Sequence, residues 1–308
     1  MTVQDELRNM SGSATMNKNL YRNTTRFRWP YLALAVLAAA GVAATPVAEA
    51  SSVPITLTPF GTVGAGAGVN EYWAQVSSTW QGPSYNASES TDTELDGISS
   101  IADANAALQL TPGQSGYIQS VSGVYAGPIN YANEMFNTDP NSQPQYGTGT
   151  LPPLFNASTA AATEIDYAGR MWGYLYVPRA GQYNFGVLAD DGFTFTLSGA
   201  NGNGESMSLD GLNPRTYTYF NQNLNLAAGL YQYDLMGYNR LQDGVVRLLM
   251  GSATGTWDPT MIPGGDFYTS VAAVPLPASL GLMGFGFAAL LGVAVVTSRK
   301  SRQRTRTV

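Results

Sequence analysis

The 308-residue chain contains no cysteine and no histidine. The lack of these two residue types excludes a Ser-His-Asp or Cys-His triad, a thiolate or imidazole zinc site, and any disulfide. A metal would have only oxygen ligands, which favours Ca²⁺ or Mg²⁺. Acid–base chemistry would depend on carboxylates, Lys, Arg or Tyr.

Basic residues are scarce in the middle of the chain. Residues 51–274 hold 18 acidic side chains against 5 arginines, and they hold no lysine. A surface this acidic repels nucleic acid and anionic lipid and attracts divalent cations. The same pattern also fits an acidic shell that only keeps the protein soluble. We therefore expect no nucleic-acid partner.

The first 50 residues have the organisation of an export signal. A polar and basic stretch over 17–29 is followed by a short apolar run over 31–44, and small residues close it at Ala48 and Ala50. This order predicts a secretory signal peptide over 1–50, cleaved before Ser51.

The last 38 residues have the organisation of a second targeting signal. Residues 278–296 are an uncharged apolar run, long enough to cross a bilayer, and a basic cluster follows from Arg299. The motif Val274, Pro275, Leu276, Pro277 stands just before the run. This tripartite tail, over 271–308, resembles the VPLPA variety of PEP-CTERM sorting signal. The resemblance implies a Gram-negative host, export across its inner membrane, and an exosortase-type sorting enzyme as a partner. The mature protein would stay anchored through 278–296 or be delivered to the cell surface or matrix.

Alternating apolar and polar side chains dominate the second half of the central region. Residues 171–177 are largely apolar, which predicts a strand covered on both faces. Period-two alternation predicts further strands at 182–189, 193–198, 216–219, 231–235 and 245–250. Turn residues recur roughly every 8 to 12 residues, as in sandwiches and barrels. The fold class is therefore all-β, an antiparallel β-sandwich.

The first half of the central region is less regular. Ser100 and Asp103 flank the start of a short apolar stretch and predict a capped helix there. Composition predicts a linker over 51–68, which is rich in Gly, and a loop over 137–153, which is rich in Pro. We assign 69–270 to one ectodomain.

Residues 173–192 run Gly-Tyr-Leu-Tyr-Val-Pro-Arg-Ala-Gly-Gln-Tyr-Asn-Phe-Gly-Val-Leu-Ala-Asp-Asp-Gly. This stretch resembles the PA-fourteen β-sandwich domain, named for the anthrax toxin protective antigen, whose pattern includes a Pro-x-x-Gly turn and Asp-Asp-Gly. The resemblance is good over 167–268 and thin over 69–166, and it implies a jelly-roll-like sandwich. Leu-Ser-Gly at 197–199 departs from the usual Ile-Asp-Gly, and residues 201–211 are an insertion.

Asp190 and Asp191 are the sharpest candidates for chemistry. Neighbouring side chains on a strand point to opposite faces, so a cis peptide bond would be needed to turn both carboxylates toward one cation. In the lectin branch of the PA-fourteen family such a pair chelates Ca²⁺, which in turn binds two vicinal sugar hydroxyls. The resemblance implies the same role here. Asn239 and Asp243, from a following loop, are the available further oxygen ligands. The alternative is that Asp-Gly between two strands marks an ordinary hairpin turn that needs no metal.

Three aromatic residues, Trp172, Tyr238 and Trp257, are candidate platforms for stacking on sugar rings. The alternative for these side chains is a place in the sandwich core. Many acidic pairs exist, but no spacing singles out the two carboxylates that a glycosidase needs.

Our leading hypothesis is an exported, non-enzymatic protein that binds glycan or exopolysaccharide through Ca²⁺. A second hypothesis is a structural or protein-interaction component of the extracellular matrix with no metal site. A glycosidase is a more remote one.

Overall fold

The computed structural model describes residues 54–86, 96–254 and 258–272. The predicted signal peptide, the apolar run 278–296, the sorting motif 274–277 and Trp257 all lie outside these ranges. In the part of the chain that is described, no helix combines the length and the apolar character needed to cross a bilayer.

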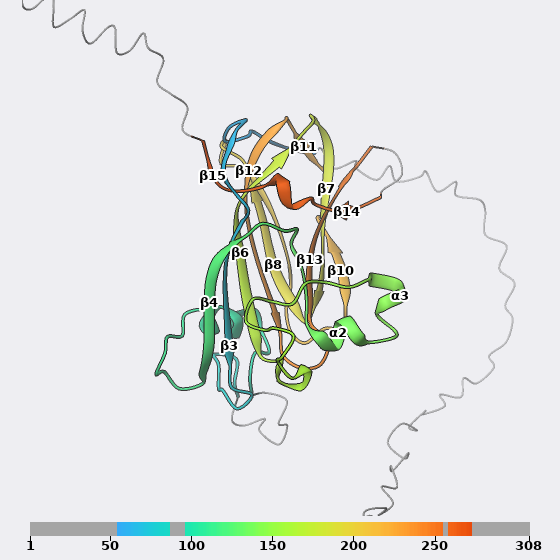
Figure 1. Ribbon diagram of the computed structural model, residues 1–308. Helices are drawn as coiled ribbons and strands as arrows, with labels where there is room; N and C mark the ends of the chain where they lie inside the picture. Colours follow the sequence, from blue (N-terminus) through green and yellow to red (C-terminus); the bar gives the residue numbers. More distant parts are fainter. Residues whose placement is uncertain (1–53, 87–95, 255–257, 273–308) are drawn as a thin grey trace, which may run out of the picture. The chain divides into compact units, whose positions relative to one another are not determined.

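Two sheets pack face to face and confirm the predicted all-β sandwich (Figure 1). The seven-stranded sheet has the order β1-β11-β7-β13-β14, with β10 on β7 and β5 on β13. Its strands are β1 (Ile55–Leu57), β5 (Asn130–Ala132), β7 (Gly181–Asp190), β10 (Thr216–Tyr219), β11 (Leu224–Leu226), β13 (Val245–Ser252) and β14 (Thr260–Met261). Only β1 and β11 pair in parallel among the described strand pairs of this sheet.

The eight-stranded sheet has the order β2-β15-β6-β12-β8-β9, with β3 pairing β6 and β4 pairing β3. Its strands are β2 (Gly64–Ala67), β3 (Val69–Val76), β4 (Tyr117–Tyr125), β6 (Tyr167–Val177), β8 (Gly192–Ser198), β9 (Gly204–Leu209), β12 (Gly229–Asn239) and β15 (Phe267–Val271). The ladder between β6 and β12 runs over all 11 residues of each strand. This long ladder sets the register of the residues that form the site at one of its ends.

Short helices cover parts of both sheets. They are α1 (Ile101–Ala107), α2 (Glu134–Thr138), α3 (Gln143–Tyr146) and the 3₁₀ turns η3 (Ala161–Thr163) and η4 (Gly264–Asp266). The predicted cap of α1 is confirmed, because the Ser100 hydroxyl accepts the backbone N–H of Asp103 at 3.1 Å. Figure 1 shows α2 and α3 beside β10, outside the seven-stranded sheet.

Large apolar side chains fill the space between the sheets, as the alternation predicts. Trp73, Phe185, Phe195 and Tyr231 are all fully buried in this core. The outer face of β6 differs from the prediction, since Trp172 on that face is 38% exposed. The strand is therefore covered on one face and only partly on the other.

The predicted linker over 51–68 is wrong where the structure describes it. β1 and β2 lie in this segment, and Leu57 is part of the core. The Gly-rich composition has a packing reason instead. A Cβ on Gly64 would lie 2.2 Å from the ring of Tyr268, so only glycine lets β2 approach β15 this closely. The predicted loop 137–153 likewise holds α3.

Candidate functional site

The Asp190-Asp191-Gly192 segment carries the chain from one sheet to the other. β7 ends at Asp190 in the seven-stranded sheet, and β8 begins at Gly192 in the eight-stranded sheet. β7 pairs with β10, β11 and β13, whereas β8 pairs with β12 and β9. The alternative of an ordinary hairpin is therefore wrong. The peptide bond between Asp190 and Asp191 is cis, which is the arrangement that the sequence resemblance implies.

Both carboxylates face one open pocket of about 260 Å³. The remaining lining comes from two loops and consists of Leu212, Asn213, Pro214, Arg215, Gln242 and Asp243. Asp190 and Asp191 are nearly buried, with 9% and 8% of their surface exposed. The backbone N–H of Arg240 donates to Asp191 Oδ2 at 2.8 Å, which fixes that side chain.

Burial makes both carboxyl groups hard to ionise. Burial, with the neighbouring charge of Asp191 and against the opposing charge of Arg215, raises the pKa of Asp190 to about 8. Burial also raises the pKa of Asp191 to about 6, against the hydrogen bond and charge of Arg240. A cation between the two carboxylates would relieve both the burial cost and the mutual repulsion.

Asn239, the last residue of β12, carries a buried amide that is unsatisfied within the described structure. The residue is 1% exposed, and neither Oδ1 nor Nδ2 has a hydrogen-bond partner among the described residues. An amide buried in this way costs about 1–3 kcal/mol. Asn239 and Asp190 both line a small cavity of about 10 Å³. Its other lining residues are mainly aromatic and aliphatic: Trp73, Tyr131, Tyr167, Gly237, Tyr238, Val245 and Val246.

Backbone contacts hold Asn239 where it is. The backbone of the next residue, Arg240, donates to Asp191 and accepts the N–H of Asp166 at 2.8 Å. Gly244 gives the amide room, because a Cβ there would lie 2.6 Å from Asn239 Cγ and 2.3 Å from the Tyr167 hydroxyl. The backbone contacts of Arg240 and the space left by Gly244 together set the position of the amide.

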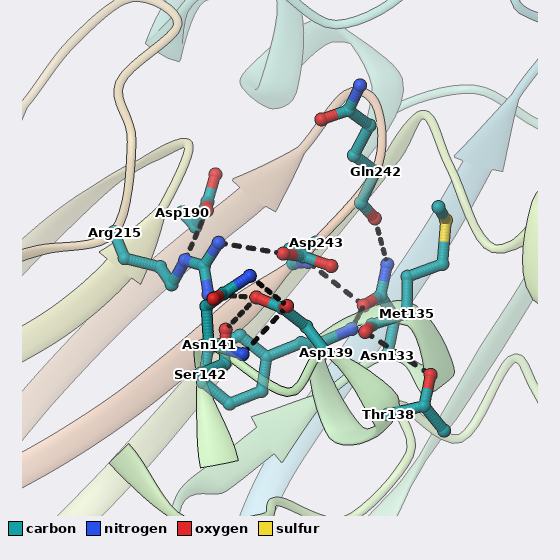
Figure 2. A network of polar contacts seen from close by, with 12 residues as sticks. Asn133, Met135, Thr138, Asp139, Asn141, Ser142, Asp190, Arg215, Gln242 and Asp243 are labelled. Carbon is teal, nitrogen blue, oxygen red and sulfur yellow. Dashed lines mark hydrogen bonds and ion pairs between the residues drawn. The ribbon is translucent and has the colours of Figure 1, made fainter. Parts of the chain in front are cut away.

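Arg215 is the internal cation of the site. Figure 2 shows its guanidinium group among three carboxylates. It donates to Asp139 and to Asp243 at 2.8 Å each, and its Nε lies 3.7 Å from Asp190 Oδ2. The ring of Phe136 lies beneath it, 5.7 Å from Cζ. The Asp243 carboxylate is therefore already paired, and its part in the site is to hold Arg215 beside the aspartate pair.

The residues at this end fit a calcium ion if side-chain amide oxygen is included. No group of three or more acidic residues that could hold a metal occurs in the described part of the chain. The candidate oxygen ligands at this end are the carboxylates of Asp190 and Asp191 with Oδ1 of Asn239. Ca²⁺ takes 6–8 oxygen ligands and accepts carboxylates, amide carbonyls and water together.

The predicted aromatic platforms do not gather at this site. Tyr238 is wrong as a platform, because it is 3% exposed and its hydroxyl donates to the Gly211 carbonyl at 2.9 Å. It lies on the outer sheet face, but α1 and the turn after β9 cover it there. Trp172 is exposed on the same face farther along β6. Trp257 lies outside the described residues.

Two residues of the site were not anticipated. Arg215 sits in the loop after the insertion, and only its rarity as one of five arginines in an acidic region marks it. Asp166 lies behind Asp191, with a φ of +52° and a pKa that burial raises to about 6. No sequence pattern that we recognise singles it out.

No protein-family model matches the chain, and no curated protein sequence matches it. Several solved structures align with its fold at low identity. The PA14 (PA-fourteen) domain of the MpAFP antifreeze protein is 16% identical, with a TM-score of 0.39 over 74% of this chain and 100% of that one. The PA14 sugar-binding domain from an RTX adhesin is 16% identical, with a TM-score of 0.38 over 66% and 99%. The Epithelial Adhesin 6 A domain from Candida glabrata, solved with Galβ1-3GlcNAc, is 18% identical, with a TM-score of 0.42 over 72% and 94%.

Proposed function

We propose that this chain is an exported, non-enzymatic protein that binds glycans through a Ca²⁺ ion held by Asp190, Asp191 and Asn239. The observation that carries the proposal is the buried, unsatisfied amide of Asn239 beside two nearly buried carboxylates of raised pKa. A cation would give the Asn239 Oδ1 the partner it lacks and would offset the charge of both carboxylates. The sequence resemblance implies the same pair as ligands.

In this proposal Asp190 and Asp191, which line the 260 Å³ pocket, would hold the cation, and the cation would supply coordination positions for ligand oxygens. Two adjacent hydroxyls of a sugar suit such positions, since Ca²⁺ exchanges water for neutral oxygen ligands readily. Asn213 and Gln242 line the pocket and offer amide groups for the remaining hydroxyls. Asp191 is oriented by the Arg240 N–H, and Arg215 limits the net negative charge around the ligand.

The test is calorimetric titration of the chelator-treated chain with CaCl₂, followed by an array of neutral and acidic glycans with and without Ca²⁺. We expect micromolar to millimolar Ca²⁺ binding and glycan binding that a chelator removes. A folded chain that takes up no Ca²⁺ at 10 mM, on the order of ten times the weakest such affinities, would leave the matrix-scaffold hypothesis ahead. Export and sorting follow from the two ends of the sequence and belong to the proposal.

Calcium affinity should depend steeply on pH. Because the pKa values of Asp190 and Asp191 are raised to about 8 and about 6, the metal must displace protons below these values. We expect the affinity to rise about 100-fold per pH unit below pH 6, about 10-fold per unit from 6 to 8, and little above 8. Titrations at pH 5, 6, 7 and 8 check this.

The stability of the calcium-free protein should change in the opposite sense. The folded state keeps these protons up to about pH 6 and 8, whereas the unfolded chain loses them near pH 4. The folded state therefore binds more protons in this window, and its stability falls as pH rises from about 4 to about 8. Thermal unfolding without Ca²⁺ should show a falling midpoint, and added Ca²⁺ should remove the fall. A flat profile in both conditions contradicts the assigned pKa directions.

Arg215 is expected to oppose calcium. Its guanidinium lies beside Asp190, so Arg215→Gln removes a repelling charge and frees Asp139 and Asp243. We expect about tenfold tighter Ca²⁺ binding by calorimetry. Arg215→Lys keeps the charge and should bind within a few-fold of the original chain. Weaker binding in Arg215→Gln would show that the arginine positions the ligands rather than competing with the ion.

A further inference from the structure

A separate groove lies on the outer face of the eight-stranded sheet, next to the C-terminal end of α1. It encloses about 370 Å³. It is lined by Tyr72 of β3, Arg170 and Trp172 of β6, and Asn105, Leu108 and Gln109 of the α1 region. On β6 and β12, Trp172 pairs with Asp234 while Tyr167 pairs with Asn239. Five residues of strand, or about 17 Å, thus separate this groove from the calcium site along the sheet.

Two aromatic side chains, Tyr72 and Trp172, line the groove. Tyr72 lies directly opposite Arg170 in the ladder between β3 and β6, and Trp172 is the next outward residue. Their sequence neighbours Trp73 and Met171 are fully buried in the core, so these side chains point outward. Trp172 is 38% exposed, so much of its surface is available to a ligand.

The rim of the groove offers hydrogen-bonding groups of both kinds. Arg170 Nε bonds both carboxylate oxygens of Asp234, at 3.0 and 3.1 Å, which neutralises its charge and leaves further N–H donors. Asn105 Nδ2 donates to the Ile101 carbonyl at 2.9 Å, and Gln109 Nε2 donates to the Asn105 carbonyl at 3.0 Å. These bonds engage the amide nitrogens, and the amide oxygens serve as acceptors.

The groove is also rigid, because α1 is fixed at its start. Its cap residue Ser100 binds Asp103, and the carboxylate of Asp103 accepts the backbone N–H of Ser84 at 2.8 Å and that of Ser99 at 3.1 Å. Burial alone would raise the pKa of Asp103, but the hydrogen bonds from Ser84 and Ser99 outweigh it and lower the pKa. Ala104 pins the helix to the sheet as a fully buried residue. A ligand would meet a preformed surface and lose little to ordering.

We infer that this groove is a second saccharide site, which takes a neutral sugar ring and needs no metal. The aromatic side chains of Tyr72 and Trp172 offer a surface for the apolar face of a pyranose, and rim donors and acceptors suit its hydroxyls. The ion pair of Arg170 with Asp234 leaves no net charge to select an acidic ligand. The inference goes beyond the calcium site, and it holds or fails independently of that site.

The experiment is binding of the full chain to an array of neutral oligosaccharides built from glucose, galactose, mannose and N-acetylglucosamine, in excess EDTA and in Ca²⁺. We expect one class of glycans to bind in EDTA. Trp172→Ala should weaken that binding about tenfold or more, and Trp172→Phe should retain most of it. Asp190→Asn should leave the EDTA-resistant binding unchanged. If the original chain binds glycans in EDTA but shows no additional Ca²⁺-dependent binding, the result counts against the proposed function and not against this groove.

Tyr217→Ala is the matched control. Tyr217 is an aromatic residue with the same 38% exposure, but it lies on β10 in the other sheet. An Asn105→Ala/Gln109→Ala double variant tests the rim with surface changes that leave the sheet intact, and it should weaken binding several-fold. Absence of any EDTA-resistant glycan binding, or equal binding by Trp172→Ala, overturns the inference. So does Trp172-dependent self-association by gel filtration, which would make the groove an interface between copies.

Discussion

Replacing either carboxylate of the pair by its amide, Asp190→Asn or Asp191→Asn, should weaken Ca²⁺ binding by about 100-fold or more. Each change removes one of the two anionic ligands in the proposed set, and the remaining ligand, Asn239, is neutral. Calorimetric titration at pH 8, where the Asp191 carboxyl of the original chain is ionised and that of Asp190 is about half ionised, gives the comparison with the least competition from protons. Calcium-dependent glycan binding should disappear with the metal.

The same substitutions should make the calcium-free protein more stable at pH 8. An amide has neither the burial cost of a charge nor the repulsion that raises the pKa of Asp190 to about 8. We expect the thermal midpoint to rise by a few degrees, equivalent to about 1–2 kcal/mol. A gain in stability with loss of metal binding is the pattern of a site kept for function. Simple unfolding cannot produce it.

Asp266→Asn is the control for this comparison. Asp266 also has a pKa raised by burial, but it lies in η4 just before β15, away from the pair. Its amide should leave Ca²⁺ binding unchanged. If Asp190→Asn and Asp191→Asn bind Ca²⁺ as the original chain does, the aspartate pair is not the metal site.

Asn239→Leu, which removes the uncharged ligand of the proposed set, is also expected to change both stability and Ca²⁺ binding. Leucine has nearly the shape of asparagine and no polar atoms, so it removes the two unsatisfied groups of the amide. The calcium-free protein should gain about 1–3 kcal/mol. Calcium binding should fall by at least about tenfold, because an inner oxygen ligand is lost. Denaturant unfolding and calorimetry measure the two effects on the same samples.

Asn239→Asp separates the charge of this ligand from its position. It adds a third buried carboxylate, so the calcium-free protein should become less stable as pH rises, while Ca²⁺ binding at pH 8 should be retained or become tighter. Should Asn239→Leu instead destabilise the calcium-free protein, the amide has a structural partner and the proposed ligand set is wrong.

Much of the sandwich could be predicted from the chain because alternation records which face of a strand is buried. The strand patterns around 183–189, 193–197 and 231–235 correspond to β7, β8 and β12. β2 was not predicted, because its sequence, Gly-Ala-Gly-Ala, has no strand preference of its own. Its pairing depends on the Tyr268 ring occupying the space that a side chain would need, which is a long-range property.

The burial of Tyr238 could not be predicted from the sequence. The residue does face outward on β12, as Trp172 does on β6, but α1 and the turn after β9 close over it. Which part of an outer face a helix covers depends on tertiary packing. The aspartate pair could be found from the sequence because its signature is local. Arg215 could not be found in this way, because the three aspartates with which it forms ion pairs lie 25 to 76 positions away along the chain.

The first and last strands of the described chain, β1 and β15, have their outer ends at the end of the sandwich opposite the aspartate pair. Ile55 aligns with Leu224, which aligns with Tyr183 near the start of β7, whereas Asp190 ends that strand. At the other terminus, the N–H of Ala272 bonds the Val63 carbonyl, close to the bridge between Gly61 and Leu230 at the start of β12. A ligand at Asp190 and a tether beyond residue 272 would therefore pull along the strands. Under such tension the hydrogen bonds of the 11-residue ladder between β6 and β12 would be loaded in shear, all together, rather than broken one after another.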